Sequence, residues 1–201
     1  MYEKVIKRFL DILLSGLALI LLSWLFVVLA IVICIDDPGP VFFKQKRVGK
    51  DKTYFQLHKF RSMKMTAPHD VPTEELENFS SHITRVGAFL RKSSLDEIPQ
   101  FWDVFWGKMS LIGPRPALWN QYDLIEKRDQ CGANSIRPGL TGWAQVNGRD
   151  KMSLKEKVAH DAAYTQALRE GGVKAFRMDV QVFYLTFGSV ITHKGFAEGK
   201  Q

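Results

Sequence analysis

The sequence SLDEIPQ at residues 94–100 decides how the rest of the chain is interpreted. Its Asp96 and Glu97 place two carboxylates side by side in a chain of formal net charge +7. Ser94 and Glu97 have the spacing of a capping box, and Pro99 suits the first turn of a helix. The pattern therefore predicts both carboxylates at a helix N-terminus, where the helix dipole keeps them ionised. They would either cap that helix or serve a bound metal or a reaction.

Cations flank this acidic pair in the sequence. Arg91 precedes it, and Arg115 follows it within the sequence GPRP at residues 113–116. The prolines restrict the backbone on both sides, which gives Arg115 a defined direction. A planar guanidinium held in this way suits a phosphate group. Lys59 closes a predicted strand, where the ordinary role of a lysine is a solvated charge.

The composition is that of a folded protein with an anionic partner. The chain has 201 residues, 46% of them hydrophobic and 24% charged, which excludes an intrinsically disordered protein. The net charge of +7 favours nucleic acid, a membrane surface or a phosphorylated substrate. We find no helix-turn-helix, zinc or RNA-stacking motif, so nucleic acid is not expected. Cys34 and Cys131 do not make a disulfide framework, which favours a reducing, cytosolic setting.

Residues 12–35 carry no charge and predict a membrane anchor. In a helix rising about 1.5 Å per residue they are long enough for a hydrocarbon core of about 30 Å. Basic residues stand on both flanks, and such residues accumulate on the cytoplasmic side of a membrane. This symmetry favours a segment that enters and leaves on one side over a plain span, and both topologies stay open. We therefore expect an anchoring helix at residues 1–36 and a cytosolic domain at residues 37–201.

The remaining elements predict an α+β domain with a small antiparallel sheet. Residues 41–43 and 53–60 predict two strands of a hairpin. Residues 83–92, 117–128 and 153–170 predict helices, the last with a capping box of Ser153 and Glu156. An apolar segment at residues 180–191 could pack in the core or lie as an amphipathic helix against lipid. The aromatic face formed by Phe101, Trp102, Phe105 and Trp106 favours core packing, with the lipid interface as the alternative.

Residues 137–149 form a second dense stretch, RPGLTGWAQVNGR. Its Pro-Gly and Asn-Gly pairs predict tight turns. Its glycines allow close approach of the backbone to a ligand, and an arginine stands at each end. The stretch matches no known phosphate-loop spacing, so a pair of turns is the simpler interpretation and an anion cradle the alternative.

The chain resembles the small monotopic phosphoglycosyl transferases, bacterial sugar transferases that start glycan assembly on a polyprenyl carrier. The resemblance runs nearly end to end. Besides residues 94–100 it rests on PGPVFFKQ at residues 38–45, KFRSM at residues 59–63, MSLIGPRP at residues 109–116 and residues 137–149. In the family the membrane segment is typically broken by a Ser-Pro pair, whereas this chain has Ser23-Trp24. Ser23 can still bend the helix by bonding to a carbonyl of the preceding turn.

The resemblance implies a two-step transfer at the cytoplasmic face of a bacterial inner membrane. Asp96 would attack the β-phosphorus of a nucleoside-diphosphate sugar, usually a UDP-sugar, and UMP would leave. Polyprenyl phosphate would then accept the phosphosugar from the aspartate. The resemblance also implies Mg²⁺, held by Asp96 and Glu97, with Glu97 as an alternative base for the acceptor phosphate.

The resemblance assigns further residues to substrate binding. Lys59, Arg91 and Arg115 would neutralise phosphate oxygens. The nucleotide-side loop matches Arg137, Gln145, Asn147 and Arg149, and polar positions of the family's site match Asp161 and Asp179. The competing hypothesis is a basic, membrane-anchored scaffold that binds anionic lipid or nucleotide without catalysis. It leaves the Asp96–Glu97 pair unexplained, and no feature of the sequence predicts the sugar or an oligomeric state.

Overall fold

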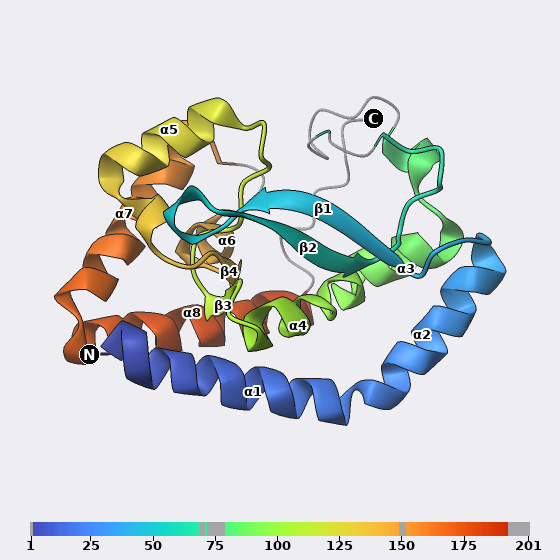
Figure 1. The fold of residues 1–201 in the computed structure, drawn as a ribbon, viewed down its shortest axis with the longest axis horizontal. Coiled ribbons are helices and arrows are strands. Elements are labelled where there is room, and N and C mark those ends of the chain that lie inside the picture. The colour runs from blue at the N-terminus through green and yellow to red at the C-terminus, as the bar shows by residue number, and fades with distance from the viewer. Residues whose placement is uncertain (1, 69–70, 72–78, 149–151, 193–201) are drawn as a thin grey trace.

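The computed structural model describes residues 2–68, 71, 79–148 and 152–192 (Figure 1). The α-helices are α1 (Arg8–Leu21), α2 (Ser23–Asp36), α3 (Arg85–Lys92), α4 (Gln100–Phe105), α5 (Tyr122–Cys131), α6 (Trp143–Asn147), α7 (Leu154–Glu170) and α8 (Gly172–Thr192). The strands are β1 (Phe42–Val48), β2 (Tyr54–Phe60), β3 (Ser110–Ile112) and β4 (Gly139–Thr141). Within this part of the chain helices surround two two-stranded sheets, in agreement with the α+β class.

The predicted hairpin is confirmed. β1 and β2 pair antiparallel, with Phe42 opposite Phe60 and Val48 opposite Tyr54. Phe55 and Leu57 of β2 are buried in one cluster with Val104 of α4 and with Met109, which follows α4. The hairpin therefore carries Lys59, near its end, over the segment that contains the acidic pair.

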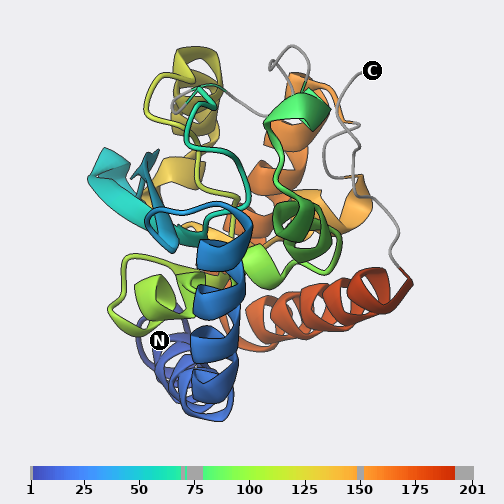
Figure 2. The same cartoon turned by 90° about the vertical axis from the view of Figure 1, so that its right-hand side faces the viewer.

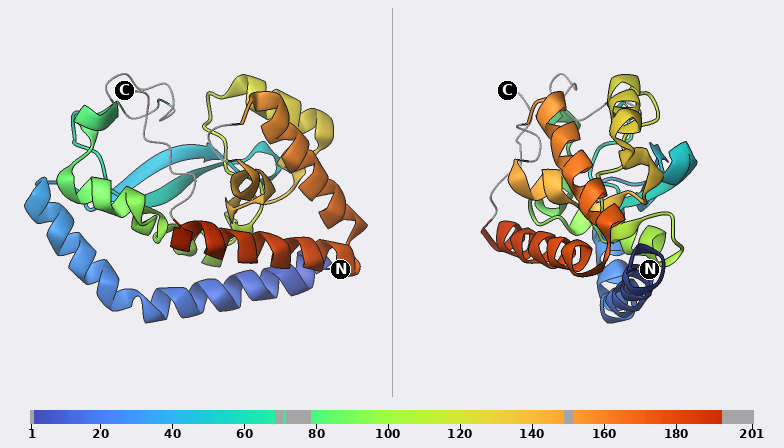
Figure 3. Two further views of the ribbon diagram at one scale, coloured as in Figure 1. Left: turned by 180° about the vertical axis from the view of Figure 1, so that it is seen from behind. Right: turned by 90° about the vertical axis from the view of Figure 1, so that its left-hand side faces the viewer.

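A bent pair of helices lies along one side of the molecule (Figures 1 and 3). The segment Tyr2–Leu21 and α2 meet at an angle of 59°. The hydroxyl of Ser23 donates a hydrogen bond to the carbonyl of Ile20 at 2.8 Å, which is the back-bond that the sequence predicts at this point. Among the described residues no single helix is long and apolar enough to cross a membrane, whereas the two arms together reach that length and apolarity.

The helices are distributed over two ends of the molecule. α5 and α7 lie at one end and α2 and α3 at the other, with the hairpin and α4 between them (Figure 1). Turned by 90°, α8 extends sideways from the lower part of the molecule (Figure 2). The hydrophobic core is accordingly divided into several clusters, one beneath the hairpin and others around α2, α5 and α8.

Several local predictions are corrected by the structure. The helix expected at residues 117–128 begins only at Tyr122. Gly148 of the Asn-Gly pair is in a turn at the end of α6, whereas the turn expected at Pro138-Gly139 is replaced by the start of β4, which pairs in parallel with β3. This pairing is close, because a Cβ on Gly113 would lie 2.5 Å from the carbonyl oxygen of Arg137. Glycine therefore serves here to bring two backbones together.

The aromatic face of α4 does not pack in the core as expected. Trp102 and Trp106 are 50% and 62% exposed, and Phe105 is 36% exposed. Only Phe101 packs against the buried cluster of α2 and α3. The four-residue repeat of the sequence thus marks an apolar face that is largely exposed in this structure.

Candidate active site

Asp96 and Glu97 lie in a single 3₁₀ turn, Leu95–Glu97, between α3 and α4. The predicted capping box does not form, because Ser94 adopts a left-handed conformation with φ of 57° and its side chain caps nothing. α4 begins later, at Gln100, with Pro99 as the residue before it. The two carboxylates are therefore held in a tight turn ahead of the helix, where helix capping does not occupy them.

Two cations contact the acidic pair directly. The Nζ atom of Lys59 lies 2.7 Å from Oε1 of Glu97 and 3.6 Å from Oδ2 of Asp96. The guanidinium of Arg115 donates to the same oxygen of Glu97 at 3.1 Å. β2 supplies Lys59, and the loop after β3 supplies Arg115. Three segments that are far apart in the sequence thus meet at this point.

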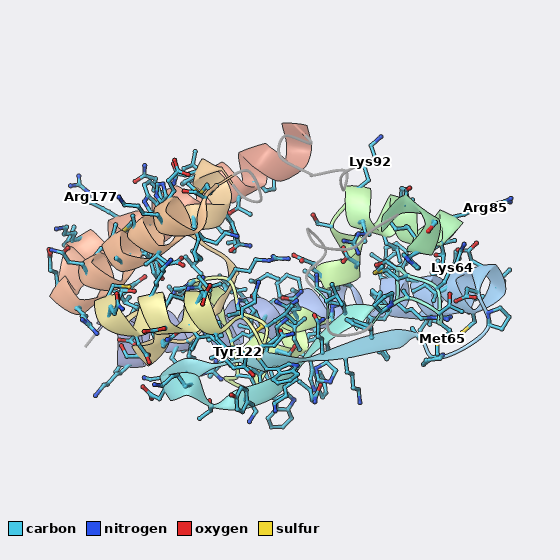
Figure 4. The ribbon with its side chains drawn as sticks, turned by 90° about the horizontal axis from the view of Figure 1, so that it is seen from above. Lys64, Met65, Arg85, Lys92, Tyr122 and Arg177 are labelled. Atoms are coloured by element: carbon cyan, nitrogen blue, oxygen red, sulfur yellow. The ribbon has the colours of Figure 1, made fainter. Side chains whose placement is uncertain are left out.

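Arg91 adds a third positive charge from α3. Its electrostatic attraction favours the charged form of Asp96. Its Nη1 atom also lies 3.5 Å from the hydroxyl of Ser62. The two other basic residues of the helix, Arg85 and Lys92, point away from the molecule (Figure 4). The structure therefore brings together five of the predicted site residues, namely Lys59, Arg91, Asp96, Glu97 and Arg115.

The two carboxylates differ in their electrostatics. Burial raises the pKa of Asp96, and the charges of Lys59, Arg91 and Arg115 only partly offset this effect. Burial also acts to raise the pKa of Glu97, but Lys59 and Arg115 outweigh it and hold that pKa well below its usual range. Glu97 is therefore ionised at neutral pH and is a poor proton acceptor. The predicted ionisation is supported for Glu97, whereas burial works against it for Asp96. The negative charge of Asp96 would therefore gain from a further cation.

The acidic pair fits a Mg²⁺ ion that shares its coordination with a substrate. Among the described residues no group of three or more His, Cys, Asp or Glu side chains could hold a metal ion by itself. Mg²⁺ is commonly bound by one or two carboxylates together with substrate phosphates and water. Two adjacent carboxylates provide the protein's share of such a site.

The described site candidates of the second dense stretch donate hydrogen bonds to backbone carbonyls, while Oε1 of Gln145 is buried without a hydrogen-bond partner among the described residues. Arg137 donates through Nε to the carbonyl of Gly107 at 3.0 Å, near the end of α4. Gln145 donates to the carbonyl of Leu140, and Asn147 to that of Trp143. Arg149 lies outside the described residues. In this conformation Gln145 and Asn147 donate to backbone carbonyls of their own stretch, and Arg137 donates to a carbonyl just after α4.

Asp161 and Asp179 are buried inside the fold. Asp161, on α7, accepts two hydrogen bonds from Arg128 at 2.6 and 2.8 Å. Asp179, on α8, accepts hydrogen bonds from Tyr2, Lys7 and Tyr164 at 2.7 to 2.9 Å. These contacts tie α5 to α7 and the N-terminal segment to α8.

The model of the bacterial sugar transferase family matches residues 2–193 of the chain. The chain belongs to this family. It is 40% identical over 193 residues to a UDP-glucose:undecaprenyl-phosphate glucose-1-phosphate transferase of Escherichia coli K12, an alignment that covers 92% of the chain and 40% of that protein.

Two further relatives show the range of the bacterial sugar transferase family. The chain is 36% identical over 200 residues to UDP-N-acetylgalactosamine-undecaprenyl-phosphate N-acetylgalactosaminephosphotransferase of Aeromonas hydrophila, covering 94% of the chain and 44% of that protein. It is 33% identical over 191 residues to the uncharacterized sugar transferase EpsL of Bacillus subtilis, covering 95% of the chain and 90% of that protein. The chain thus spans less than half of the first two relatives, and those two are named for different sugars.

Two buried or partly buried residues of this family member, Arg128 and His58, make contacts that were not predicted from the sequence. Arg128 is 4% exposed and bonds both to Asp161 and to the loop that carries Arg115. His58, next to Lys59 on β2, bonds to Asp103 of α4 through its backbone N–H at 2.9 Å and its Nδ1 atom at 2.8 Å. Both lie in segments where charged residues are common, and nothing in their spacing separates them from surface residues.

Proposed function

We propose that this chain transfers a sugar phosphate from a UDP-sugar to polyprenyl phosphate through a covalent intermediate on Asp96. The observation that carries the proposal is the buried Asp96 beside Glu97, with the cations of Lys59, Arg91 and Arg115 around the pair. The names of the relatives support the two substrate classes, because they combine a UDP-sugar with undecaprenyl phosphate. The product would begin the assembly of a glycan on a lipid carrier.

In the first half-reaction a carboxylate oxygen of Asp96 attacks the β-phosphorus of the UDP-sugar. A bond forms between that oxygen and the phosphorus, and the bond to the bridging oxygen breaks, so UMP leaves with the electron pair. A carboxylate is a weak nucleophile, but phosphoryl transfer depends mainly on positioning and on neutralisation of charge. Burial removes water from Asp96, which would leave its oxygen free to attack.

In the second half-reaction an oxygen of polyprenyl phosphate attacks the phosphorus of the aspartyl intermediate. The phosphosugar moves to the lipid phosphate, and Asp96 is regenerated as a carboxylate. Glu97 does not suit the role of base in this step, because its pKa is held below its usual range. It suits the role of a fixed negative charge that orients Lys59 and Arg115.

The cations would hold the diphosphate while its charge is redistributed. Lys59 lies between both carboxylates, and Arg115, whose side chain is 45% exposed, can reach a ligand in solution. Mg²⁺ held by Asp96 and Glu97 together with the diphosphate would supply further charge neutralisation.

The bent helices would place this site at a membrane. Large apolar side chains along both arms are exposed, among them Ile20, Trp24 and Ile35 at 72%, 64% and 78%. The exposed Trp102 and Trp106 of α4 belong to a residue type that gathers at membrane interfaces. We infer a helix that enters and leaves the cytoplasmic leaflet of the inner membrane, with both of its flanks in the cytoplasm.

The topology is tested by labelling single cysteines in intact cells. Lys4→Cys lies at the start of the first arm and Lys92→Cys beyond the second arm, both at exposed positions, in a chain with Cys34 and Cys131 replaced by serine. We expect an impermeant thiol reagent to reach neither cysteine until the cells are opened. Labelling of only one of them would establish a spanning helix.

The reaction is tested by UMP release from a panel of UDP-sugars. Purified protein is mixed with polyprenyl phosphate and Mg²⁺, with a matched sample in EDTA. We expect one UDP-sugar to give UMP that depends on the metal. Without polyprenyl phosphate, the protein should release one equivalent of UMP and gain the mass of a phosphosugar on the peptide that contains Asp96. Folded protein that releases UMP from no sugar would overturn the proposal.

A further inference from the structure

Arg128 connects the interior of the fold to the loop that carries Arg115. It lies on α5, and its Nε and Nη2 atoms donate to Oδ2 of Asp161 at 2.8 and 2.6 Å. Its Nη1 atom donates to the backbone carbonyl of Arg115 at 2.8 Å. The side chains of Arg128 and Asp161 are only 4% and 2% exposed. One buried guanidinium thus bonds to a carboxylate on α7 and to the backbone of a proposed substrate-binding residue.

The backbone around Arg115 is held at three successive carbonyls. The N–H of Gly139 donates to the carbonyl of Pro114 at 2.9 Å. Arg128 donates to that of Arg115, and Arg47 donates to that of Pro116 at 2.9 Å. The rings of Pro114 and Pro116 restrict φ on both sides. Together these contacts determine the position from which the side chain of Arg115 reaches Glu97.

The chemistry of the pair argues for a role beyond joining two helices. A buried ion pair adds little stability compared with apolar residues of similar size. Arginine, unlike lysine, presents several donors in a fixed plane and can serve two acceptors in different directions. Arg128 bonds in this way to two different segments of the chain, through the carboxylate of Asp161 and the backbone carbonyl of Arg115.

We propose that Arg128, held by Asp161, is a positioning residue that sets the direction of Arg115 toward the acidic pair. The proposal rests on the proposed function only in assigning Arg115 to the substrate phosphates. It also gives Asp161 a different role from the one that the family resemblance implies. Asp161 would act through Arg128 and would not touch the substrate.

The test is a double-mutant cycle of Arg128→Lys and Arg115→Ala, read as kcat and KM for UMP release. Lysine keeps a charge beside Asp161 but lacks the planar set of donors with which Arg128 bonds to both acceptors. We expect Arg128→Lys alone to lower kcat about 10- to 100-fold, the size of a small misplacement in an active site. In the Arg115→Ala background the same change should lower kcat by less than about threefold, because coupled residues are not additive. Equal losses in both backgrounds would overturn the proposal.

Asp129→Asn is the matched control. Asp129 is the next residue on α5, and its carboxylate bonds to Lys52 and Asn134 at the surface. This variant should leave kcat unchanged. If Arg128→Lys does not fold, Asp161→Asn replaces it in the cycle, because it keeps the shape and removes the charge that holds Arg128. The same non-additive pattern is then required.

Amide hydrogen exchange gives a reading that needs no substrate. In Arg128→Lys the amides of residues 113–118 should exchange faster, while those of β2, which does not bond to this loop, keep their wild-type rates. Unchanged exchange in residues 113–118 would overturn the proposal. Faster exchange in a protein whose wild type releases no UMP would reject the proposed function and retain the positioning role.

Discussion

Asp96 and Asp179 are equally buried, each at 6% exposure, yet their surroundings differ. Asp179 accepts hydrogen bonds from Tyr2, Lys7 and Tyr164. Asp96 lies 3.6 Å from Lys59, beyond the distance of a good hydrogen bond, and burial raises its pKa. A buried carboxylate whose oxygens are satisfied stabilises a fold, whereas one that is under-compensated is poised to interact with something else. Exposure alone does not separate the two roles, but the partners do.

Asp96→Asn should have the largest effect on activity and no cost in stability. Asparagine cannot act as the nucleophile, so we expect UMP release to fall by about 10⁴-fold or more, as when other nucleophiles are removed. Thermal unfolding should occur at the same temperature or higher, because a poorly compensated buried charge is lost. UMP release near the wild-type level would show that Asp96 forms no covalent intermediate.

Asp179→Asn should show the opposite pattern. The change leaves the ammonium of Lys7 buried without its charged partner, since the side chains of Lys7 and Asp179 are each 8% exposed. We expect the free energy of unfolding to fall by about 3–5 kcal/mol, as when one partner of a buried pair is removed. Denaturation in urea measures this loss.

Activity per folded molecule shows whether Asp179→Asn affects only stability or the reaction as well. Below the unfolding transition, UMP release should stay within a few-fold of wild type. Lys7→Met should be destabilising too, and the two changes together should cost less than the sum. Loss of activity in fully folded Asp179→Asn would show that Asp179, like Asp96, is needed for the reaction and does more than stabilise the fold.

Glu97→Gln should lower UMP release less than Asp96→Asn does and more than Asp179→Asn does. It removes the charge that Lys59 and Arg115 share, so we expect UMP release to fall about 10²- to 10³-fold, the range seen when one electrostatic contact of an active site is lost. Glutamine retains the shape of the side chain, so the fold should remain intact by circular dichroism.

The pH dependence of stability separates the electrostatic role of Glu97 from its role in turnover. The pKa of Glu97 is lowered in the folded protein, so its charge stabilises the fold above the unfolded pKa of about 4.3. This contribution is lost as the pH falls below that value toward the folded pKa. The difference in stability between wild type and Glu97→Gln should therefore be constant from pH 8 to about pH 5 and shrink in more acidic solution. A difference that changes near neutral pH would contradict the lowered pKa.

The sequence predicted the elements whose signals are local. The hairpin follows from alternation and a turn, and the capping box of Ser153 and Glu156 is present as predicted. The capping box of Ser94 has the same spacing but does not form, because that residue adopts a left-handed conformation. Such a conformation depends on how α3 and α4 pack, which no pattern of four residues contains.

The site was predicted only in part, because the tertiary contacts of a residue are not contained in a local sequence pattern. The cluster of Lys59, Arg91 and Arg115 around the acidic pair was anticipated by the family resemblance. That resemblance did not separate residues facing a ligand from those that support them. Asp161 and Asp179 stand at family positions, yet each is paired inside the fold. Arg128 was missed because a buried arginine differs from a surface arginine only in its three-dimensional contacts.

Ser153→Ala should have the smallest effect, because it removes a contact of an exposed carboxylate, that of Glu156. Glu156 bonds to the backbone N–H and hydroxyl of Ser153 at the start of α7, and both residues lie at the surface. Loss of the N-cap should lower the free energy of unfolding by about 1 kcal/mol, with UMP release unchanged. Since α7 also carries Asp161, a fall in kcat larger than this small destabilisation explains would show that the position of the helix is transmitted to Arg128 and Arg115. Unchanged kcat would mean that the buried contacts of α7 hold Asp161 in place without the cap.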